Sequence, residues 1–408
     1  MNVMLLALIP LFDENMAVRA YSIFSQKDNS FLNPMMQGTA RFDGAMAVEG
    51  MELIERMGIE TISEDKEIFV PVSNISIFTD VEAQCSAPHH RIVFLIDNTI
   101  PPVEMYINRL RELKEKGYKL AVRKLAVSDF EAYREVLMLT DYVFLNNKKI
   151  AIKKAKVYFG KLFPNVKLCA GGIEKMETFE NLKESGGYQL FEGEFYRVPV
   201  TKGNHEIAPL KANYIQLLNM VNSDNFELSE AADIIGRDPA LTILLLKMVN
   251  RMTVNSGITT IRHAAAMLGQ KELRKWITTA VVNELYADKP SEVTRLSLLR
   301  AKFAEELGPS FGLENRAEEL FLMGLFSVLD VIMEKPMKEA MKMVMVPEEV
   351  KNALIHGKGQ LAPIYDLMRH YEVANWQEVS RQLLLADLRT ETISEAYINA
   401  LSWYKKLI

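Results

Sequence analysis

The chain has 408 residues, of which 49% are hydrophobic and 25% are charged, and its formal net charge is −5. This length favours two or three domains, and the composition is that of a protein able to bury substantial cores. The negative net charge argues against a general nucleic-acid coat, because binding to phosphates requires an excess of cations. We therefore expect no nucleic-acid partner.

The cysteines and the apolar segments indicate a compartment. Cys85 and Cys169 show no CxxC spacing, so we expect neither a disulfide framework nor a zinc site, and a reducing environment fits. The apolar start, Met1–Phe12, lacks the basic region of a secretion signal and is interpreted as a buried first strand. The apolar run Leu320–Met333 is too short to span a bilayer. These features predict a cytoplasmic protein without membrane insertion.

In the first half, short apolar runs alternate with amphipathic segments. The expected strands are Val3–Ile9, Ile68–Val72, Ile92–Ile96, Lys119–Val122, Tyr142–Leu145 and Val166–Cys169. The expected helices are Pro102–Lys116, Asp129–Leu137, Lys148–Phe163 and Lys175–Ser185. Such alternation indicates parallel βα units, for which a barrel and an open doubly wound sheet are both possible. No glycine-rich phosphate-binding motif follows a strand.

The strand after Gly117 ends in two cations, Arg123 and Lys124. Gly117 stands where a helix end needs a left-handed residue, immediately before this strand. Arginine and lysine side chains offer hydrogen-bond donors, whereas magnesium and calcium require oxygen ligands. This strand end is therefore unsuited to hold a divalent metal.

A segment rich in proline, glycine and polar residues, Arg197–Pro209, separates the two halves, and we place the domains at 1–199 and 200–408. The second half is helical throughout. Asp238 suits an N-cap and Pro239 the first helical position. The other expected helices are Glu230–Ile235, Thr260–Leu268 (stopped by Gly269), Glu272–Leu285, Ser291–Phe311 and Glu314–Met333.

The second half resembles an HDOD domain. The matching segments are Ile235–Thr242, Leu244–Asn250 and Ile261–Gly269, with Trp276 shortly after. In the related HD phosphohydrolases, the helix that corresponds to Phe321–Asp330 carries a His-Asp metal pair. The matching positions here are Ser327 and Val328, and no His-Asp dipeptide occurs among the six histidines. The resemblance therefore implies no metal-dependent phosphohydrolase.

The first half resembles an EAL domain, the barrel of cyclic-di-GMP phosphodiesterases, in the arrangement found in EAL–HDOD signalling proteins. The matching segments are Ile9–Asp13, Gly117–Ala121, Asp141–Leu145, Ala170–Glu174 and Tyr188–Gly193. The resemblance implies an α/β plus all-α chain. Its N-terminal part would be a degenerate EAL-type, TIM-like (β/α) barrel, and its C-terminal part an HDOD helical domain.

The polar residues of the EAL site are missing at nearly every matching position. The glutamate of the Glu-Ala-Leu signature, the ligand asparagine, the strand-four glutamate and a later glutamate correspond to Ser22, Pro71, Leu95 and Gly171. The paired aspartates correspond to Arg123 and Lys124, the catalytic lysine and its aspartate partner to Phe144 and Asn146, and two substrate-contacting glutamines to Ile9 and Glu192. Glu174 is the one matched acid, and a single carboxylate cannot hold a two-metal site.

The resemblance and these substitutions imply a protein that is not an enzyme. It would be a signalling or scaffold protein that acts through protein partners such as kinases, without cofactor or metal, and cyclic-di-GMP binding is doubtful. We expect Leu95 and Phe144 to fill the barrel core. As an alternative, Arg123 and Lys124 form an anion or nucleotide sensor at the barrel mouth. They could equally be solvated or paired with Asp97 or Glu174. A remote alternative is an active cyclic-di-GMP phosphodiesterase.

Overall fold

The computed structural model describes residues 5–26, 48–198, 209–223, 226–236, 239–252, 258, 260–285 and 291–407. The chain forms two compact units, and the second is inserted into the first. The first unit comprises Met1–Val198, Lys302–Ala317 and Asp366–Ile408. The second comprises Pro199–Ala301 and Glu318–Tyr365.

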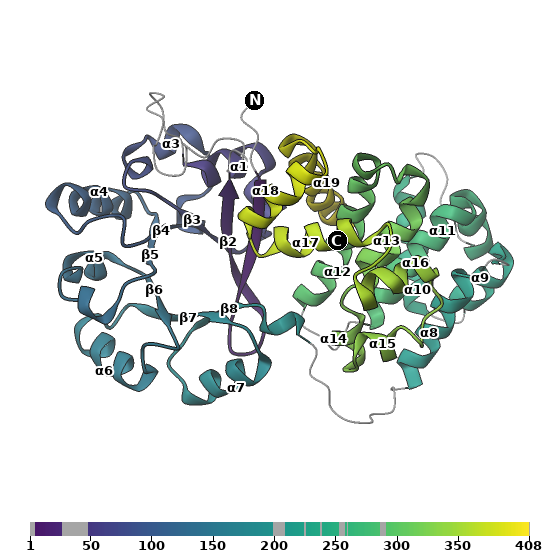
Figure 1. Ribbon diagram of the computed structural model, residues 1–408, viewed down its shortest axis with the longest axis horizontal. Coiled ribbons are helices and arrows are strands. Elements are labelled where there is room, and N and C mark those ends of the chain that lie inside the picture. The colour runs from purple at the N-terminus through teal and green to yellow at the C-terminus, as the bar shows by residue number, and fades with distance from the viewer. Residues whose placement is uncertain are drawn as a thin grey trace. The chain divides into compact units, whose positions relative to one another are not determined.

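Eight strands of the first unit form a closed barrel in chain order (Figure 1). They are β1 Leu5–Phe12, β2 Val18–Gln26, β3 Glu67–Pro71, β4 Ile92–Ile96, β5 Lys119–Val122, β6 Tyr142–Asn146, β7 Lys167–Ile173 and β8 Leu190–Gly193. Strand β1 is antiparallel to both neighbours, and the other pairs are parallel. The closed sheet decides between the two folds that the alternation alone allowed, and the predicted barrel is confirmed.

Helices lie around the barrel and bury one face each. They are α1 Glu49–Met57, α2 Ile59–Ser63, α3 Val81–Gln84, α4 Glu104–Glu115, α5 Arg134–Leu139, α6 Ile152–Leu162 and α7 Met176–Ser185. In α4 the buried residues are Ile107, Leu110 and Leu113, a spacing that places them on one side of the helix. After α4, Gly117 has φ +92°, so the predicted left-handed residue before β5 is confirmed.

The barrel interior is filled by side chains from every second residue of the strands. The core comprises Leu11, Ala20, Phe69, Val93, Leu95, Ala121, Tyr142, Phe144, Cys169 and Leu190. Leu95 and Phe144 are buried, as their residue types predicted. Because side chains alternate between the two faces of a strand, residues two positions further along β2, β5 and β8 also face inward. Ser22, Arg123 and Glu192 are therefore directed toward the mouth of the barrel.

The C-terminal helices α17 Ala362–Glu372, α18 Trp376–Leu385 and α19 Thr390–Leu407 lie beside β1 and β2 (Figure 1). The ladder between β1 and β8 comprises two residues of β1, Leu11 and Phe12, whereas β1 pairs with β2 along its whole length. In the remaining part of β1, the Leu6 N–H donates to the hydroxyl of Tyr371 at 3.1 Å. The C-terminal helices thus lie against the part of β1 that does not pair with β8.

The predicted division at residues 199 and 200 lies in a segment outside the described residues. The compact units differ from that division because 302–317 and 366–408 group with the barrel. The physical reason is that most of β1 does not pair with β8. Its main-chain N–H and C=O groups on that side need hydrogen-bond partners or burial by other segments. The predicted cap residue Asp238 also lies outside the described residues.

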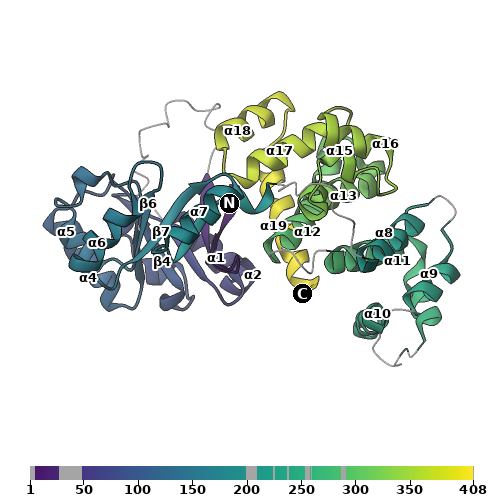
Figure 2. The same cartoon turned by 90° about the horizontal axis from the view of Figure 1, so that it is seen from below.

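The second unit is built from helices, of which α8 to α11 gather together (Figure 2). The elements are α8 Pro209–Val221, α9 Leu228–Ile235, α10 Pro239–Met252, α11 Ile261–Leu285, α12 Ser291–Leu307 (whose last turns, from Lys302, belong to the first unit), α13 Ala317–Phe326, α14 Leu329–Met333, α15 Met337–Ala340 and α16 Glu348–Lys351. Gly269 has φ +74° and interrupts α11, which confirms the predicted stop. The predicted helix Glu314–Met333 is instead broken between α13 and α14. Throughout the described part of the chain, we find no helix that combines the length and the apolar character needed to cross a membrane.

Candidate functional site

The carboxyl ends of four neighbouring strands surround a cavity of about 460 Å³ at the barrel mouth. Strand β2 contributes Phe24 and Ser25, β4 contributes Leu95, and Arg123 and Lys124 follow β5. Barrels of this type carry their active sites at this face. The cavity therefore lies where a barrel of this type would carry a catalytic or binding site.

Arg123 places a cation inside this mouth. Its Nη2 lies 3.1 Å from Oε1 of Glu192, and its side chain is 20% exposed. The guanidinium carbon lies 5.4 Å from the ring centroid of Phe24 and 5.4 Å from that of Phe144. A carboxylate and two aromatic faces are the partners that a partly desolvated guanidinium prefers. Arg123, which the EAL resemblance aligns with an aspartate, is thus a cation bound at the barrel mouth.

Glu192, the partner of Arg123, lines a second cavity of about 200 Å³. A Cβ atom at Gly171 would lie 3.7 Å from Oε1 of Glu192. The Glu192 carboxylate thus lies next to the space that a side chain at position 171 would occupy. Glu192 itself belongs to β8, whereas Gly171 belongs to the neighbouring strand β7. Oε2 of Glu192 is buried and has no hydrogen-bond partner among the described residues.

Lys124 pairs with Asp97, one of the two partners considered from the sequence. Its Nζ lies 3.1 Å from Oδ2 of Asp97, and its side chain is 64% exposed. Burial acts to raise the pKa of Asp97, but hydrogen bonds from the side chain and main chain of Thr99 and from Lys124 lower it overall. Lys124 also has φ +63°, a conformation unfavourable for a residue with a Cβ.

The remaining predicted positions do not join this pair. Ser22 is fully buried, and its Oγ has no hydrogen-bond partner within the described segments. Pro71 and Asn146 are exposed. Glu174 is 72% exposed and lies 2.9 Å from Lys148. The hydrogen bond and charge of Lys148 lower the pKa of Glu174. The single matched acid is thus an exposed ion-pair partner of Lys148, and it lines the same cavity of about 200 Å³ as Glu192.

Sequence reasoning missed two residues of this site, Phe24 and the ion-pair role of Glu192. The alternation of inward and outward residues was a usable signal for both. Ala20 and Leu190 face the core, so Phe24 and Glu192 share the inward face of their strands.

In the second unit, Ser327 contacts another arginine. Arg300 Nη1 donates to Oγ of Ser327 at 3.0 Å, and this hydroxyl donates to the carbonyl of Gly324 at 2.6 Å. The side chains of Arg300 and Ser327 are both buried. These contacts accompany the break between α13 and α14, and they explain why the predicted continuous helix ends here.

Comparison with known proteins identifies a domain in the second half of the chain. The family model of the HDOD domain matches residues 207–354. Cyclic di-GMP phosphodiesterase CdgJ of Vibrio cholerae serotype O1 is 27% identical over 321 residues, which cover 78% of this chain and 74% of that protein. The chain therefore contains an HDOD domain at residues 207–354.

Other similar proteins differ in how much of this chain they cover. The uncharacterized protein YuxH of Bacillus subtilis is 26% identical over 412 residues, covering 98% of this chain and 97% of YuxH. The EAL enzyme Bd1971 in its cAMP and cyclic-di-GMP bound form has a TM-score of 0.37 at 12% identity, over 47% of this chain and 60% of Bd1971. The EAL domain of Mycobacterium smegmatis DcpA has a TM-score of 0.35 at 14% identity, over 47% of this chain and 90% of that domain.

The EAL resemblance implies a pair of divalent metals at the barrel mouth, and the residues present do not fit them. Metal-assisted hydrolysis of this type requires several carboxylates around two ions. Here Arg123 offers donors alone, and Leu95 and Phe144 offer no polar atom. The carboxylates of Asp97 and Glu192 already bind Lys124 and Arg123. We therefore derive no step through such metals.

Proposed function

We propose that this EAL–HDOD protein is a non-catalytic signalling or scaffold protein that acts through protein partners. The observation that carries the proposal is the ion pair between Arg123 and Glu192 at the barrel mouth, 3.1 Å between Nη2 and Oε1. A guanidinium stays protonated at all physiological pH values and accepts no hydrogen bond. A divalent cation at the same place would meet a like charge in a partly desolvated site.

The distribution of metal-ligating side chains supports the same proposal. In the described segments, three such side chains converge at Asp366, His370 and Glu378, which belong to α17 and α18 and not to the barrel mouth. Around the mouth cavity, Glu49 accepts a hydrogen bond from Ser25, and Asp97 binds Lys124. Glu49 and Asp97 thus each bind a separate partner and do not share a common binding point.

The second unit adds to this support. Ser327 and Val328 stand where HD phosphohydrolases carry a metal-binding His-Asp pair. The hydroxyl of Ser327 is engaged by Arg300 and Gly324, and Val328 is apolar. Neither Ser327 nor Val328 supplies the imidazole or carboxylate ligand that such a metal-binding pair provides.

A hydrolysis assay on the purified full-length chain tests the catalytic part of this proposal. Cyclic-di-GMP would be incubated with magnesium or manganese, with CdgJ as a reference protein and the Glu174→Ala variant as a matched control. We expect equal, background-level product from wild type and variant. Metal-dependent hydrolysis that disappears in Glu174→Ala would overturn the proposal.

Affinity capture from the native cell tests the partner. The bait should be the full chain, because a cut at residue 199 would separate the barrel from the helices that cover β1. We expect reproducible recovery of a signalling protein such as a kinase, and reciprocal capture when that protein is the bait. Recovery no greater than that of an unrelated bait would count against the partner role.

The cavity of about 460 Å³ favours a second candidate, a sensor for a nucleotide or another anion. It has weaker support because an anion would have to displace Glu192 from Arg123 or Asp97 from Lys124. Calorimetry with cyclic-di-GMP and related nucleotides tests it, with Lys124→Gln as the control. Saturable heat that the variant abolishes would establish the sensor, and no heat at high micromolar ligand would reject it for those ligands.

A further inference from the structure

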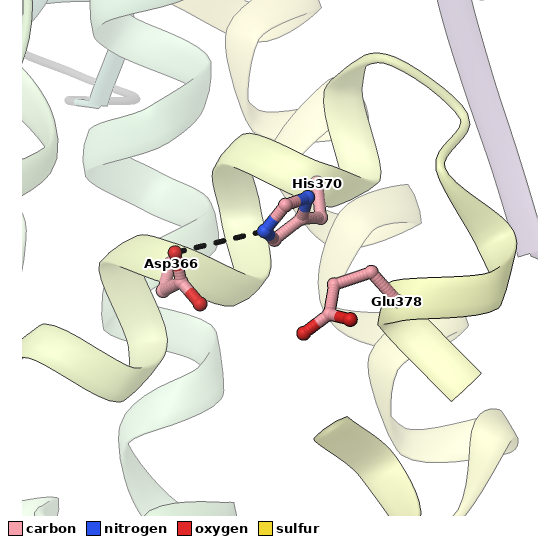
Figure 3. Close-up of side chains that lie close together, drawn as sticks. All are labelled: Asp366, His370 and Glu378. Atoms are coloured by element: carbon pink, nitrogen blue, oxygen red, sulfur yellow. Dashed lines mark ion pairs between the residues drawn. The ribbon is translucent and has the colours of Figure 1, made fainter. Parts of the chain in front are cut away.

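Two helices of the first unit bring an aspartate, a histidine and a glutamate together, outside the barrel mouth. Asp366 and His370 belong to α17, and Glu378 belongs to α18. One ligand atom from each residue lies within 4.8 Å of the others. Figure 3 shows Asp366 and His370 projecting from the same side of α17, and Glu378 reaching from α18 toward the same space. The site is independent of the proposed function.

The local sequence explains this convergence. Residues four apart lie on one face of a helix, so Asp366 and His370 are neighbours, with Oδ1 and Nε2 3.7 Å apart. Three residues join α17 to α18, and Asn375 caps α18 by accepting a hydrogen bond from the Glu378 N–H at 3.3 Å. The cap fixes the first turn of α18, which carries Glu378.

We infer that Asp366, His370 and Glu378 form a binding site for a first-row transition-metal dication, with zinc as the expected ion. An imidazole combined with two carboxylates is a donor set for such ions, whereas magnesium and calcium prefer oxygen alone. Three protein ligands leave the fourth tetrahedral position to water. The cysteine pattern gave no sign of this site because it contains no thiolate.

The two carboxylates, Asp366 and Glu378, lie close enough to contact the same hydrogen-bond donor. Gln382 Nε2 donates to Oδ2 of Asp366 at 2.6 Å and lies 3.4 Å from Oε1 of Glu378. The amide therefore bridges two like charges, while its own Oε1 is buried without a hydrogen-bond partner in the described part of the chain. A dication would neutralise both acids directly.

Zinc binding requires small, specific rearrangements. Zinc–ligand bonds of about 2.1 Å place neighbouring donors roughly 3.4 Å apart, so the side chains must close by about 1 Å. Arg381 binds both oxygens of Glu378, but its side chain is 51% exposed, and an exposed ion pair is readily exchanged. Oε2 of Glu378 accepts one hydrogen bond from Arg381 Nε, and its second lone pair can ligate.

The histidine tautomer gives the proposal a sharper consequence. Asn375 Nδ2 lies 3.3 Å from Nδ1 of His370 and can donate to it in the tautomer that carries the ring proton on Nε2. Ligation through Nε2 moves this proton to Nδ1 and requires an acceptor at position 375. Metal-bound histidines donate their second N–H to such an acceptor. A carboxylate at position 375 should therefore strengthen binding.

The test is equilibrium zinc binding to the metal-free full-length chain, with cobalt as a spectroscopic probe. We expect one zinc per chain, visible d–d absorption with cobalt, and at least a tenfold loss of affinity in each of His370→Ala, Asp366→Asn and Glu378→Gln. His356→Ala, which changes an exposed histidine of the second unit, should bind like wild type. Asn375→Asp should bind about tenfold more tightly, because it keeps the helix cap and supplies the acceptor.

Two outcomes would overturn the proposal. One is the absence of saturable zinc binding to the wild type. The other is binding that His370→Ala leaves unchanged, since the imidazole is the one nitrogen ligand of the site. The result with Asn375→Asp separates ligation from mere folding effects, because a structural role of the cap predicts no gain in zinc affinity.

Discussion

Each compact unit contains an arginine bound by a polar side chain, Arg123 at the barrel mouth and Arg300 beside Ser327, but the two arginines are held in different ways. Arg123 is 20% exposed and contacts a carboxylate and two aromatic rings. Arg300 is 6% exposed and contacts the hydroxyl of Ser327, in a region where two helices touch closely. Burial raises the pKa of nearby Asp330, and the charge of Arg300 opposes this rise.

This difference lies in the space around each arginine. At the barrel mouth, Arg123 lines a cavity and forms an ion pair with Glu192. In the second unit, Arg300 and Ser327 are both buried in the packed core. Changes at the barrel mouth should therefore alter local electrostatics, whereas changes beside Arg300 should unfold the second unit.

The largest effect is expected for Gly324→Ala. A Cβ at this position would lie 2.3 Å from the main-chain carbon and oxygen of Arg300, so α12 and α13 would have to separate. We expect a loss of about 3 kcal/mol in the free energy of unfolding, measured with urea. Gly160→Ala is the matched control in α6, where an added Cβ meets no atom within 4 Å. It should be neutral or stabilising by up to about 1 kcal/mol. Equal stability of the two variants would contradict the close contact.

The ion pair of the barrel mouth is tested by a double-mutant cycle with Arg123→Met and Glu192→Gln. Each single change leaves a mostly buried group without its partner and should cost about 2 kcal/mol in the free energy of unfolding. The double variant should cost less than the sum of the two, with a coupling of about 1 kcal/mol. Additive losses would mean that Arg123 and Glu192 act independently, and the proposed role of the pair at the mouth would then lose its support.

A third pair of variants asks whether the C-terminal helices are an integral part of the barrel unit. Tyr371→Phe removes the acceptor of the buried Leu6 N–H and should cost about 1 to 2 kcal/mol in the free energy of unfolding. Tyr188→Phe is the control because the Tyr188 hydroxyl is buried with no partner among the described residues. Burial alone raises the pKa of Tyr188 to about 12. The control should be neutral or slightly stabilising.

Much of the fold could be predicted because its signals are local. The alternation of strands and helices, the left-handed Gly117 and the stop at Gly269 each depend on a few neighbouring residues. The burial of Leu95 and Phe144 follows from their residue types. Where the outcome depended on packing between distant segments, sequence patterns were insufficient. The break between α13 and α14 is one such case, because it involves Arg300 from another helix.

The candidate site shows the same limit. Arg123 was singled out from the sequence, but its partner Glu192 is 69 residues away and comes from a strand that local patterns did not reveal. Choosing Glu192 over Asp97 or Glu174 requires the strand order and the register of the closed barrel. The zinc site proposed on α17 and α18 likewise depends on the turn at Asn375, which brings Glu378 to Asp366 and His370.

The smallest expected effect concerns Lys124, where backbone strain and an exposed ion pair oppose each other. The left-handed conformation costs a residue with a Cβ about 1 kcal/mol, and glycine avoids this cost. The exposed pair with Asp97 contributes about 0.5 kcal/mol. Lys124→Gly should therefore stabilise the fold slightly, whereas Lys124→Gln should destabilise it slightly, as measured by urea unfolding near neutral pH.

The pH dependence separates these two contributions. The pKa of Asp97 is lowered in the folded state, so the stability it provides is present above its unfolded pKa and is lost as the pH falls through the folded value. The difference between wild type and Lys124→Gln should thus vanish at acidic pH, where Asp97 is protonated. The gain in Lys124→Gly, which arises from the backbone, should persist there and become larger. If the stability gained in Lys124→Gly instead decreased at acidic pH, the left-handed conformation of residue 124 would carry no strain.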